Sequence, residues 1–260
     1  MQFFVDIFNI FKNYSGYLFL GVANTLLIAL VGTMAGLVIG LLIGVLRTAP
    51  LSGKTPLRFL HRFANGFCSV YIEIFRGTPM MVQAMVIYWG YAFATGGNTL
   101  PLLGAGMFIV SVNTGAYMAE IVRGGILSID KGQLEGAAAI GMTHSQTMLH
   151  VVIPQVMRNI LPSVSNEFVI NIKDTSVLNV IGVAELYYYA AVIKRFNLQI
   201  FQNYFVVCIL YFLMTFTVTR LLRFCEKKLA GKENYTVFGS QSDPNAEIHI
   251  KNTTEEIPND

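Results

Sequence analysis

Long runs of apolar residues with few charges are the feature that most limits how this chain can fold. Five such runs, each about twenty residues or longer, lie at about 17–46, 63–93, 101–122, 156–183 and 201–222. In lipid, a spanning segment must satisfy its own backbone hydrogen bonds, which favours helices. Only 13% of the 260 residues are charged, against about a quarter in soluble domains. The sequence therefore predicts an all-α, polytopic membrane bundle of five transmembrane helices.

Lysine and arginine are distributed unevenly between the connections. The first and third connections and the segment after the fifth run are basic, whereas the fourth holds only Lys194 and Arg195. Because basic loops remain in the cytoplasm, we expect the N-terminus outside and the C-terminus in the cytoplasm. The chain then divides into an extracytoplasmic N-terminal arm at 1–16, a transmembrane domain at 17–225 and a polar cytoplasmic tail at 226–260.

Glycines repeat at every fourth position of the first run, at Gly32, Gly36, Gly40 and Gly44. Residues four apart share one face of a helix, so these glycines form a smooth strip that another backbone can approach closely. The strip fits two interpretations, packing within the chain or contact with a second copy.

Residues 128–153 separate the third and fourth runs and read as two short helices. Asp130–Ile140 can form the first, and Gly141 is a natural stop in the left-handed region. Thr143 followed by Gln146 has the capping-box pattern of a second helix start. We expect Pro154 to end this pair where the chain re-enters the membrane.

The first short helix carries small side chains that suit an insertion into a groove of another protein. Ala137, Ala138 and Ala139 give it a low profile, and Glu135 adds a single charge. An ordinary surface loop is the simpler interpretation, but such a loop does not need two capped helices.

The passage from Glu135 to Pro154 resembles the signature of membrane subunits of ATP-binding cassette (ABC) importers. The matching residues are Glu135, Gly136, Ala137, Gly141, Val151, Ile153 and Pro154. The stretches FRGTPMMVQ (75–83), GAYMAEIVRGGILSIDKGQ (115–133), IPQVMRNILPSVSNEF (153–168) and IKDTSVLNVIGVAEL (172–186) are similar to the polar amino-acid uptake subfamily, the histidine/glutamine/arginine/cystine type.

The resemblance implies a multi-pass permease subunit in a prokaryotic cell membrane that takes up polar amino acids. Its implied partners are a second permease subunit, identical or a sister chain, an extracytoplasmic amino-acid-binding protein and separate ATPase subunits, which hold the ATP and Mg²⁺. No cofactor and no nucleic acid are implied for this chain. The implied ATPase-coupling residues are Glu135, Gly136, Ala137, Ala138, Gly141 and Pro154.

Four polar residues of the fourth run fall on one narrow helix face: Ser163, Glu167, Asn171 and Asp174. Charges inside a span are costly and usually functional. This face could line a pathway for a zwitterion, with Glu167 or Asp174 meeting an ammonium group. The alternative is that these residues form internal pairs that fix the bundle.

The second run is interrupted at Gly77, Thr78 and Pro79. Pro79 lacks a backbone donor, and a broken helix at membrane depth is tolerated where it lines a cavity or is buried in protein. Thr78 and Gln83 are therefore pathway candidates. Glu73 and Arg76 are candidates too, although three residues apart on one face they can simply pair.

The third run has a polar face of its own, formed by Asn113, Tyr117 and Glu120. Glu120 and Arg123 lie three residues apart near its cytoplasmic end. We expect them to form a structural ion pair.

Nothing in the sequence indicates an enzyme or a metal site. The stretch SGKT (52–55) resembles the end of a phosphate-binding loop, but Thr48 stands where that motif needs glycine. His61, His144 and His150 have no metal-ligand spacing, and no nucleophile–base pair is evident. An ABC permease for another small solute and a gradient-driven secondary transporter remain alternatives to amino-acid uptake.

Overall fold

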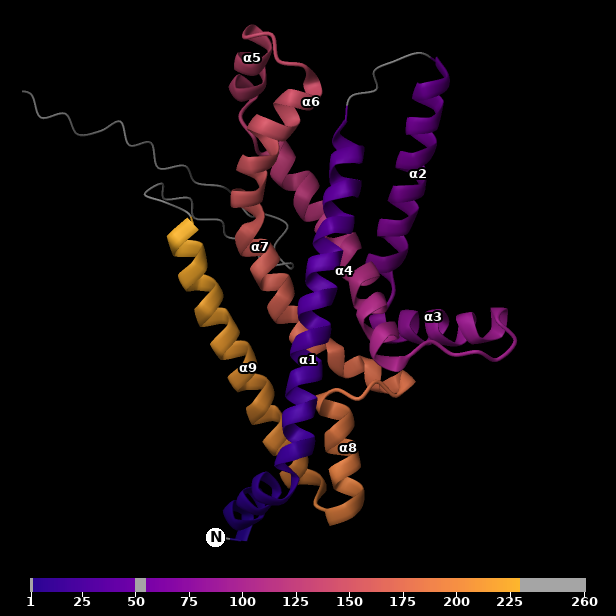
Figure 1. Ribbon diagram of the computed structural model, residues 1–260, viewed down its shortest axis with the longest axis vertical. Helices are drawn as coiled ribbons and strands as arrows, with labels where there is room; N and C mark the ends of the chain where they lie inside the picture. The colour runs from indigo at the N-terminus through magenta and orange to yellow at the C-terminus, as the bar shows by residue number, and fades with distance from the viewer. Residues whose placement is uncertain (1, 50–54, 230–260) are drawn as a thin grey trace, which may run out of the picture.

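The computed structural model describes residues 2–49 and 55–229, and in this part of the chain all regular structure is helical. Residues 52–54 of the SGKT stretch and residues 230–260 of the expected tail lie outside the described residues. The elements (Figure 1) are α1 (Gln2–Thr48), α2 (Thr55–Gly77), α3 (Met80–Ala94), α4 (Leu102–Leu127), α5 (Lys131–Ala139), α6 (His144–Thr147), the π-helix η1 (Met148–Val152), α7 (Ile153–Asp174), the 3₁₀-helix η2 (Thr175–Ile181), α8 (Leu186–Asn197) and α9 (Ile200–Leu229).

Within the described residues, three helices are long and apolar enough to cross a membrane: Gln2–Thr48, Leu102–Leu127 and Ile200–Lys228. A fourth crossing is present if His144–Ile181 and Leu186–Asn197, which meet at 54°, form one span. The second expected span is divided between α2 and the 15-residue α3. The chain is therefore a membrane-type helical bundle with three or four apolar spans.

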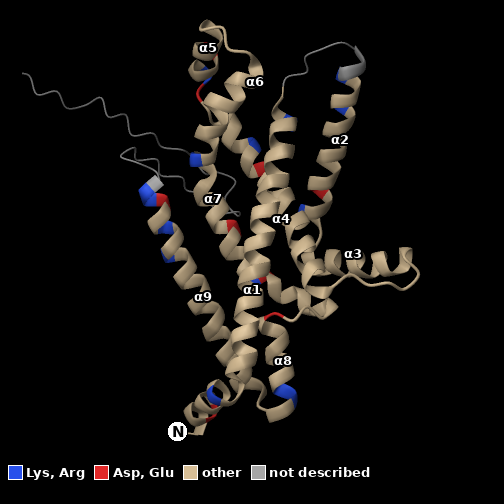
Figure 2. Cartoon of the chain, in the orientation of Figure 1, with Lys and Arg blue, Asp and Glu red and all other residues tan. Residues whose placement is uncertain are grey.

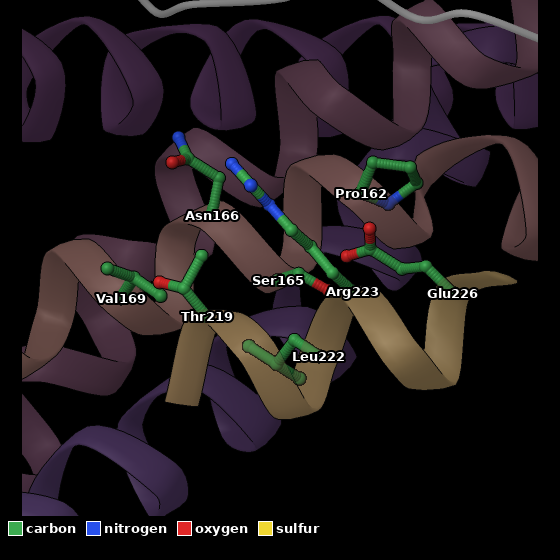
Figure 3. Close-up of a pocket in the computed structure, with 8 residues that line it drawn as sticks. All are labelled: Pro162, Ser165, Asn166, Val169, Thr219, Leu222, Arg223 and Glu226. Atoms are coloured by element: carbon green, nitrogen blue, oxygen red, sulfur yellow. The ribbon is translucent and has the colours of Figure 1, made fainter. Parts of the chain in front are cut away.

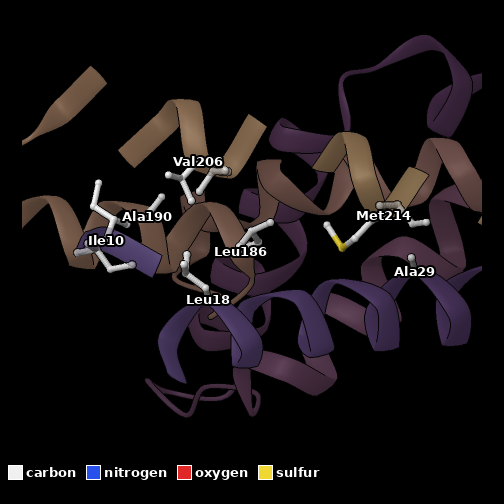
Figure 4. Packing of buried hydrophobic residues seen from close by; sticks show 10 residues of the cluster. Ile10, Leu18, Ala29, Leu186, Ala190, Val206 and Met214 are labelled. Carbon is white, nitrogen blue, oxygen red and sulfur yellow. The ribbon is translucent and has the colours of Figure 1, made fainter. Parts of the chain in front are cut away.

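The first turns of α1 pack against the α8–α9 end of the bundle. The helix bends at Tyr14, where φ is −121° and ψ is 18°. Ile10 is only 2% exposed and joins a core cluster with Leu186 and Val206 (Figure 4). Gln202 donates a 3.4 Å hydrogen bond from Nε2 to the Asp6 carboxylate. Residues expected as an arm are therefore folded onto the helices that follow.

The glycine strip of α1 is filled by α4, the helix with which α1 makes its most extensive contact. A Cβ atom built on Gly40 would lie 2.3 Å from Met118 Cβ and 2.7 Å from the Met118 carbonyl carbon. The four glycines face α4 residues that also repeat every fourth position, in the pairs Gly32–Val110, Gly36–Thr114, Gly40–Met118 and Gly44–Val122. Of the two interpretations, packing within the chain is the one observed.

The expected caps of α5 and α6 are present. Asp130 caps α5 by accepting a 2.6 Å hydrogen bond from the Gly132 amide, and Gly141 follows the helix with φ of 80°. Thr143 and Gln146 form the reciprocal capping box: the Thr143 amide donates to Gln146 Oε1 at 2.8 Å. Local chemistry thus sets the start and stop of these short helices.

Pro154 does not end the helix pair, so that expectation was wrong. The backbone continues in helical geometry from α6 through η1 into α7, and Pro154 lies in the first turn of α7. In η1, the Ile153 amide donates to the Met148 carbonyl five residues back. Proline is tolerated here because the adjacent π turn already departs from the regular pattern, in which each amide bonds the carbonyl four residues back.

Basic residues gather toward the end of the bundle that carries α5 and α6 (Figure 2). The end of α1, the start of α2 and the end of α9 point the same way (Figure 1), while the N-terminus and the α8–α9 turn lie at the opposite end. The elements at the α5–α6 end carry Arg47, Arg58, Arg62, Arg123, Lys131, Arg158, Arg220, Arg223, Lys227 and Lys228. The opposite end carries Lys12, Lys194 and Arg195.

Candidate functional site

The break between α2 and α3 is held together by the side chain of Gln83. Pro79 cannot donate to the carbonyl four residues back, which belongs to Phe75. Gln83 Nε2 donates to the carbonyls of Phe75 and Thr78, at 2.9 Å each, and Asn113 Nδ2 donates to Gln83 Oε1 at 2.8 Å. Gln83 was predicted to line a pathway, and the structure buries it with its amide occupied by the protein.

Replacing Gln83 by methionine is expected to lower the free energy of unfolding by about 1–3 kcal/mol, because buried backbone carbonyls lose their donor while side-chain volume is nearly kept. Unfolding in mixed micelles measures this change. The control is Gln155→Met, which removes a glutamine whose amide bonds the Val151 carbonyl on the α7 surface. Equal stability of the two variants would show that Gln83 does not hold the break.

Arg76 lies beside Tyr117 rather than beside Glu73. Its guanidinium carbon is 5.6 Å from the centroid of the Tyr117 ring, so the end of α2 contacts the middle of α4. Glu73 is exposed, and within the described residues it forms no ion pair with Arg76. Of the two interpretations of Glu73 and Arg76, pairing within α2 is not observed, and the arginine lies over an aromatic ring of α4 instead.

Two carboxylates of α7 lie within electrostatic range of the same tyrosine. They belong to Glu167 and Asp174, and the tyrosine is Tyr117 of α4. Glu167 is 3% exposed, whereas Asp174 is exposed. Tyr117 was not among the predicted pathway residues, although the face that it shares with Asn113 was a signal for it. The structure thus places Arg76 of α2 over the Tyr117 ring and the two α7 carboxylates within electrostatic range of it.

Asn171 has a structural place in the polar face of α7. Its Nδ2 donates to Thr33 Oγ1 at 2.8 Å, and its Oδ1 accepts from Thr114 Oγ1 at 3.1 Å. Asn171 therefore ties α7 to α1 and α4. Ser163, two turns earlier on the same face, is half-buried. The predicted polar face of α7 is present. Asn171 bonds to other helices of the bundle, whereas Glu167 and Asp174 lie within electrostatic range of Tyr117.

Glu120 and Arg123 form the expected ion pair, with 2.9 Å between Glu120 Oε2 and Arg123 Nη2. Arg47, at the end of α1, pairs with the other carboxylate oxygen of Glu120. The Glu120–Arg123 pair is therefore part of a three-residue network that joins the ends of α1 and α4.

The residues predicted to meet an ATPase lie at the α5–α6 end and are mostly exposed. Ala137 is buried, at 5% exposure, whereas the other five are exposed: Glu135, Gly136, Ala138, Gly141 and Pro154. Three large apolar side chains are exposed at the same end, Leu134, Ile140 and Leu149. An apolar surface of this kind, protruding from a bundle, is typical of a protein-binding site.

Known proteins resemble the chain in sequence and structure. The family described as "Binding-protein-dependent transport system inner membrane component" matches residues 36–231. The "Glutamine transport system permease protein GlnP" of Escherichia coli K12 is 37% identical over 209 residues, covering 80% of this chain and 91% of GlnP. The "L-cystine transport system permease protein TcyB" of Bacillus subtilis 168 is 35% identical over 210 residues, covering 80% and 85%.

A crystal structure of an amino acid ABC transporter with histidines matches with a TM-score of 0.71 and 34% sequence identity. The match covers 84% of this chain and 96% of that one. The family match extends over most of the chain, and the fold agrees with it. The chain therefore belongs to the family of inner membrane components of binding-protein-dependent transport systems.

Proposed function

We propose that this chain is the permease subunit of an ATP-driven importer of polar amino acids. The observation that carries the proposal is the charged cluster around Tyr117, where Arg76 lies over the ring beside a broken helix and Glu167 and Asp174 are within electrostatic range. A cation and carboxylates around one side chain match the carboxylate and ammonium groups of a free amino acid. The glutamine and cystine permeases among the relatives support this substrate class.

In this proposal Arg76 receives the substrate carboxylate, and Asp174 receives the ammonium group. Arg76 suits the first role because guanidinium binds carboxylate with two parallel hydrogen bonds. Asp174 suits the second because it is exposed, whereas Glu167 is almost fully buried beside it. Thr78, exposed at the break, is a further candidate contact along the pathway.

The proposed topology has five crossings, with the N-terminus outside and the C-terminus in the cytoplasm. The additional crossing is α2, whose 23 residues give a helix about 34 Å long. The gathering of basic residues at the α5–α6 end supports the orientation, since basic segments remain in the cytoplasm.

The proposed assembly contains two permease subunits, identical or sister chains, an extracytoplasmic amino-acid-binding protein, and ATPase subunits that bind α5 and α6. ATP and Mg²⁺ belong to the ATPases in this assembly. The exposed apolar side chains Leu134, Ile140 and Leu149 beside Glu135 support docking at this end.

Asp174→Asn is expected to raise the substrate concentration for half-maximal uptake about ten-fold, because one charge-assisted hydrogen bond is weakened at nearly constant volume. Arg76→Gln is expected to act in the same direction. The measurement is uptake of labelled glutamine, histidine, arginine and cystine into vesicles that contain the whole transporter.

Arg62→Gln is the matched control, since Arg62 is an exposed arginine on α2 about four turns from Arg76. Its saturation curve should equal that of the unchanged protein. If Asp174→Asn and Arg76→Gln also leave the curve unchanged, the cluster around Tyr117 is not the substrate site.

A further inference from the structure

A polar pocket of about 170 Å³ lies between α7 and α9 (Figure 3), on a different face of α7 from Glu167 and Asp174. Its α7 wall is formed by Pro162, Ser165, Asn166 and Val169. Its α9 wall is formed by Thr219, Leu222, Arg223 and Glu226. The transport mechanism proposed above makes no use of this pocket.

Arg223 and Glu226 carry opposite charges at the pocket wall and do not pair with each other. They lie three residues apart on α9, a spacing at which ion pairs commonly form. Within the part of the chain that the structure describes, neither takes part in an ion pair. The Arg223 side chain extends toward Asn166, and the Glu226 carboxylate lies near Pro162 (Figure 3). Both charged groups thus line the pocket without pairing with each other.

The distribution of charges along α9 indicates that the pocket lies at the depth of lipid headgroups. Residues 200–219 of α9 contain no charged side chain, and as a helix they extend about 30 Å, the thickness of a hydrocarbon core. Arg220 is the first charge after this stretch. Arg223 and Glu226 follow it within two turns, where the polar surface of a bilayer begins.

We propose that this pocket binds the headgroup of a phospholipid that carries a primary ammonium group, such as phosphatidylethanolamine. The phosphate would accept hydrogen bonds from the Arg223 guanidinium and from the hydroxyl or amide donors of Ser165 and Asn166. The ammonium group would donate to Glu226. A headgroup with both charges satisfies both side chains, which a purely anionic headgroup does not.

The surroundings of the pocket support a lipid rather than a dissolved ligand. α9 presents large apolar side chains outward along its length, including Phe212, Phe216 and Leu221, so acyl chains have an apolar surface to follow. The inference requires a chain embedded in a bilayer and does not depend on which solute is transported.

The test is the amount of lipid retained by the full-length transporter, purified in detergent and titrated with phosphatidylethanolamine. Arg223→Gln and Glu226→Gln are each expected to weaken retention about ten-fold, since each removes one charge-assisted hydrogen bond. The matched control is Arg220→Gln, which removes the same charge one turn earlier. The Arg220 guanidinium lies 5.1 Å from the Phe216 ring centroid and does not line the pocket, so retention should be unchanged.

Three competing ligands separate the sources of the headgroup chemistry. Phosphatidylglycerol retained as well as phosphatidylethanolamine, and unaffected by Glu226→Gln, would overturn the ammonium assignment. Soluble phosphoethanolamine bound as tightly as the lipid would overturn the lipid assignment. Phosphatidylcholine, whose quaternary ammonium has no N–H donor, should bind more weakly. Unchanged phosphatidylethanolamine retention in Arg223→Gln would overturn the site itself.

Discussion

ATP-driven uptake is expected to fall to background when Glu135 is replaced by arginine and Gly141 by leucine in the same chain. Gly141 has φ of 80°, and a side chain in this left-handed region costs about 1–2 kcal/mol. Its amide and that of Met142 donate to the carbonyls of Ala138 and Ala137 at 3.0 Å each, so strain at Gly141 loosens the end of α5. The arginine reverses the charge at Glu135 on the proposed ATPase-docking surface.

The measurement combines uptake into vesicles with ATP hydrolysis by the whole transporter and with the amount of chain in the membrane. The amount should not change, because Glu135 and Gly141 are both exposed and far from the core. The control variant is Gly124→Leu, at an exposed helical glycine of α4 with open space around it. Normal uptake in the Glu135/Gly141 variant, or uptake by this chain without an ATPase, would refute docking at α5.

Gly40→Ala is expected to lower the free energy of unfolding by about 3 kcal/mol, the upper part of the usual range for overpacking. The new Cβ would lie within 3 Å of the Met118 carbonyl carbon and of the Ala119 amide nitrogen, at 2.7 and 2.8 Å. Backbone atoms cannot rotate away as a flexible side chain can, so α1 and α4 must separate. Unfolding of the purified chain in mixed micelles measures the loss.

Gly16→Ala is the control on the same helix, because a Cβ there would meet no atom within 4 Å. It is expected to be neutral or slightly stabilising, since alanine has the higher helix propensity. Equal stability of Gly40→Ala and Gly16→Ala would mean that α1 and α4 are not in close backbone contact.

Features that depend on local chemistry were predicted correctly from the sequence. Pro79 interrupts the second apolar run, Gly141 ends α5, and the Thr143–Gln146 box starts α6. Each follows from the conformational limits of one or two residues, so no knowledge of the tertiary structure was required. The ion pair between Glu120 and Arg123 belongs to the same class, because the two residues are neighbours on one helix turn.

Features that depend on which helices meet could not be predicted in this way. Periodicity placed Asn171 on a polar face, but its partners Thr33 and Thr114 come from segments 138 and 57 residues away. The same limit applies to Gln83, which bonds the Phe75 and Thr78 carbonyls only because the chain bends at Pro79. Arg76 lies over the Tyr117 ring of α4 and does not pair with Glu73, its neighbour on α2. Sequence spacing within one helix contains no information about such neighbours.

The uninterrupted helical geometry from α6 through η1 into α7 has a mechanical consequence. Within the described residues no loop separates α6 from α7, because the backbone stays helical from His144 to Asp174. The π-helix η1 and Pro162 inside α7 are the places where such a helix bends, so they set the direction in which α7 leaves the protruding end. Beyond Pro162, α7 carries Glu167, Asn171 and Asp174, so a change in either bend would move those side chains within the bundle.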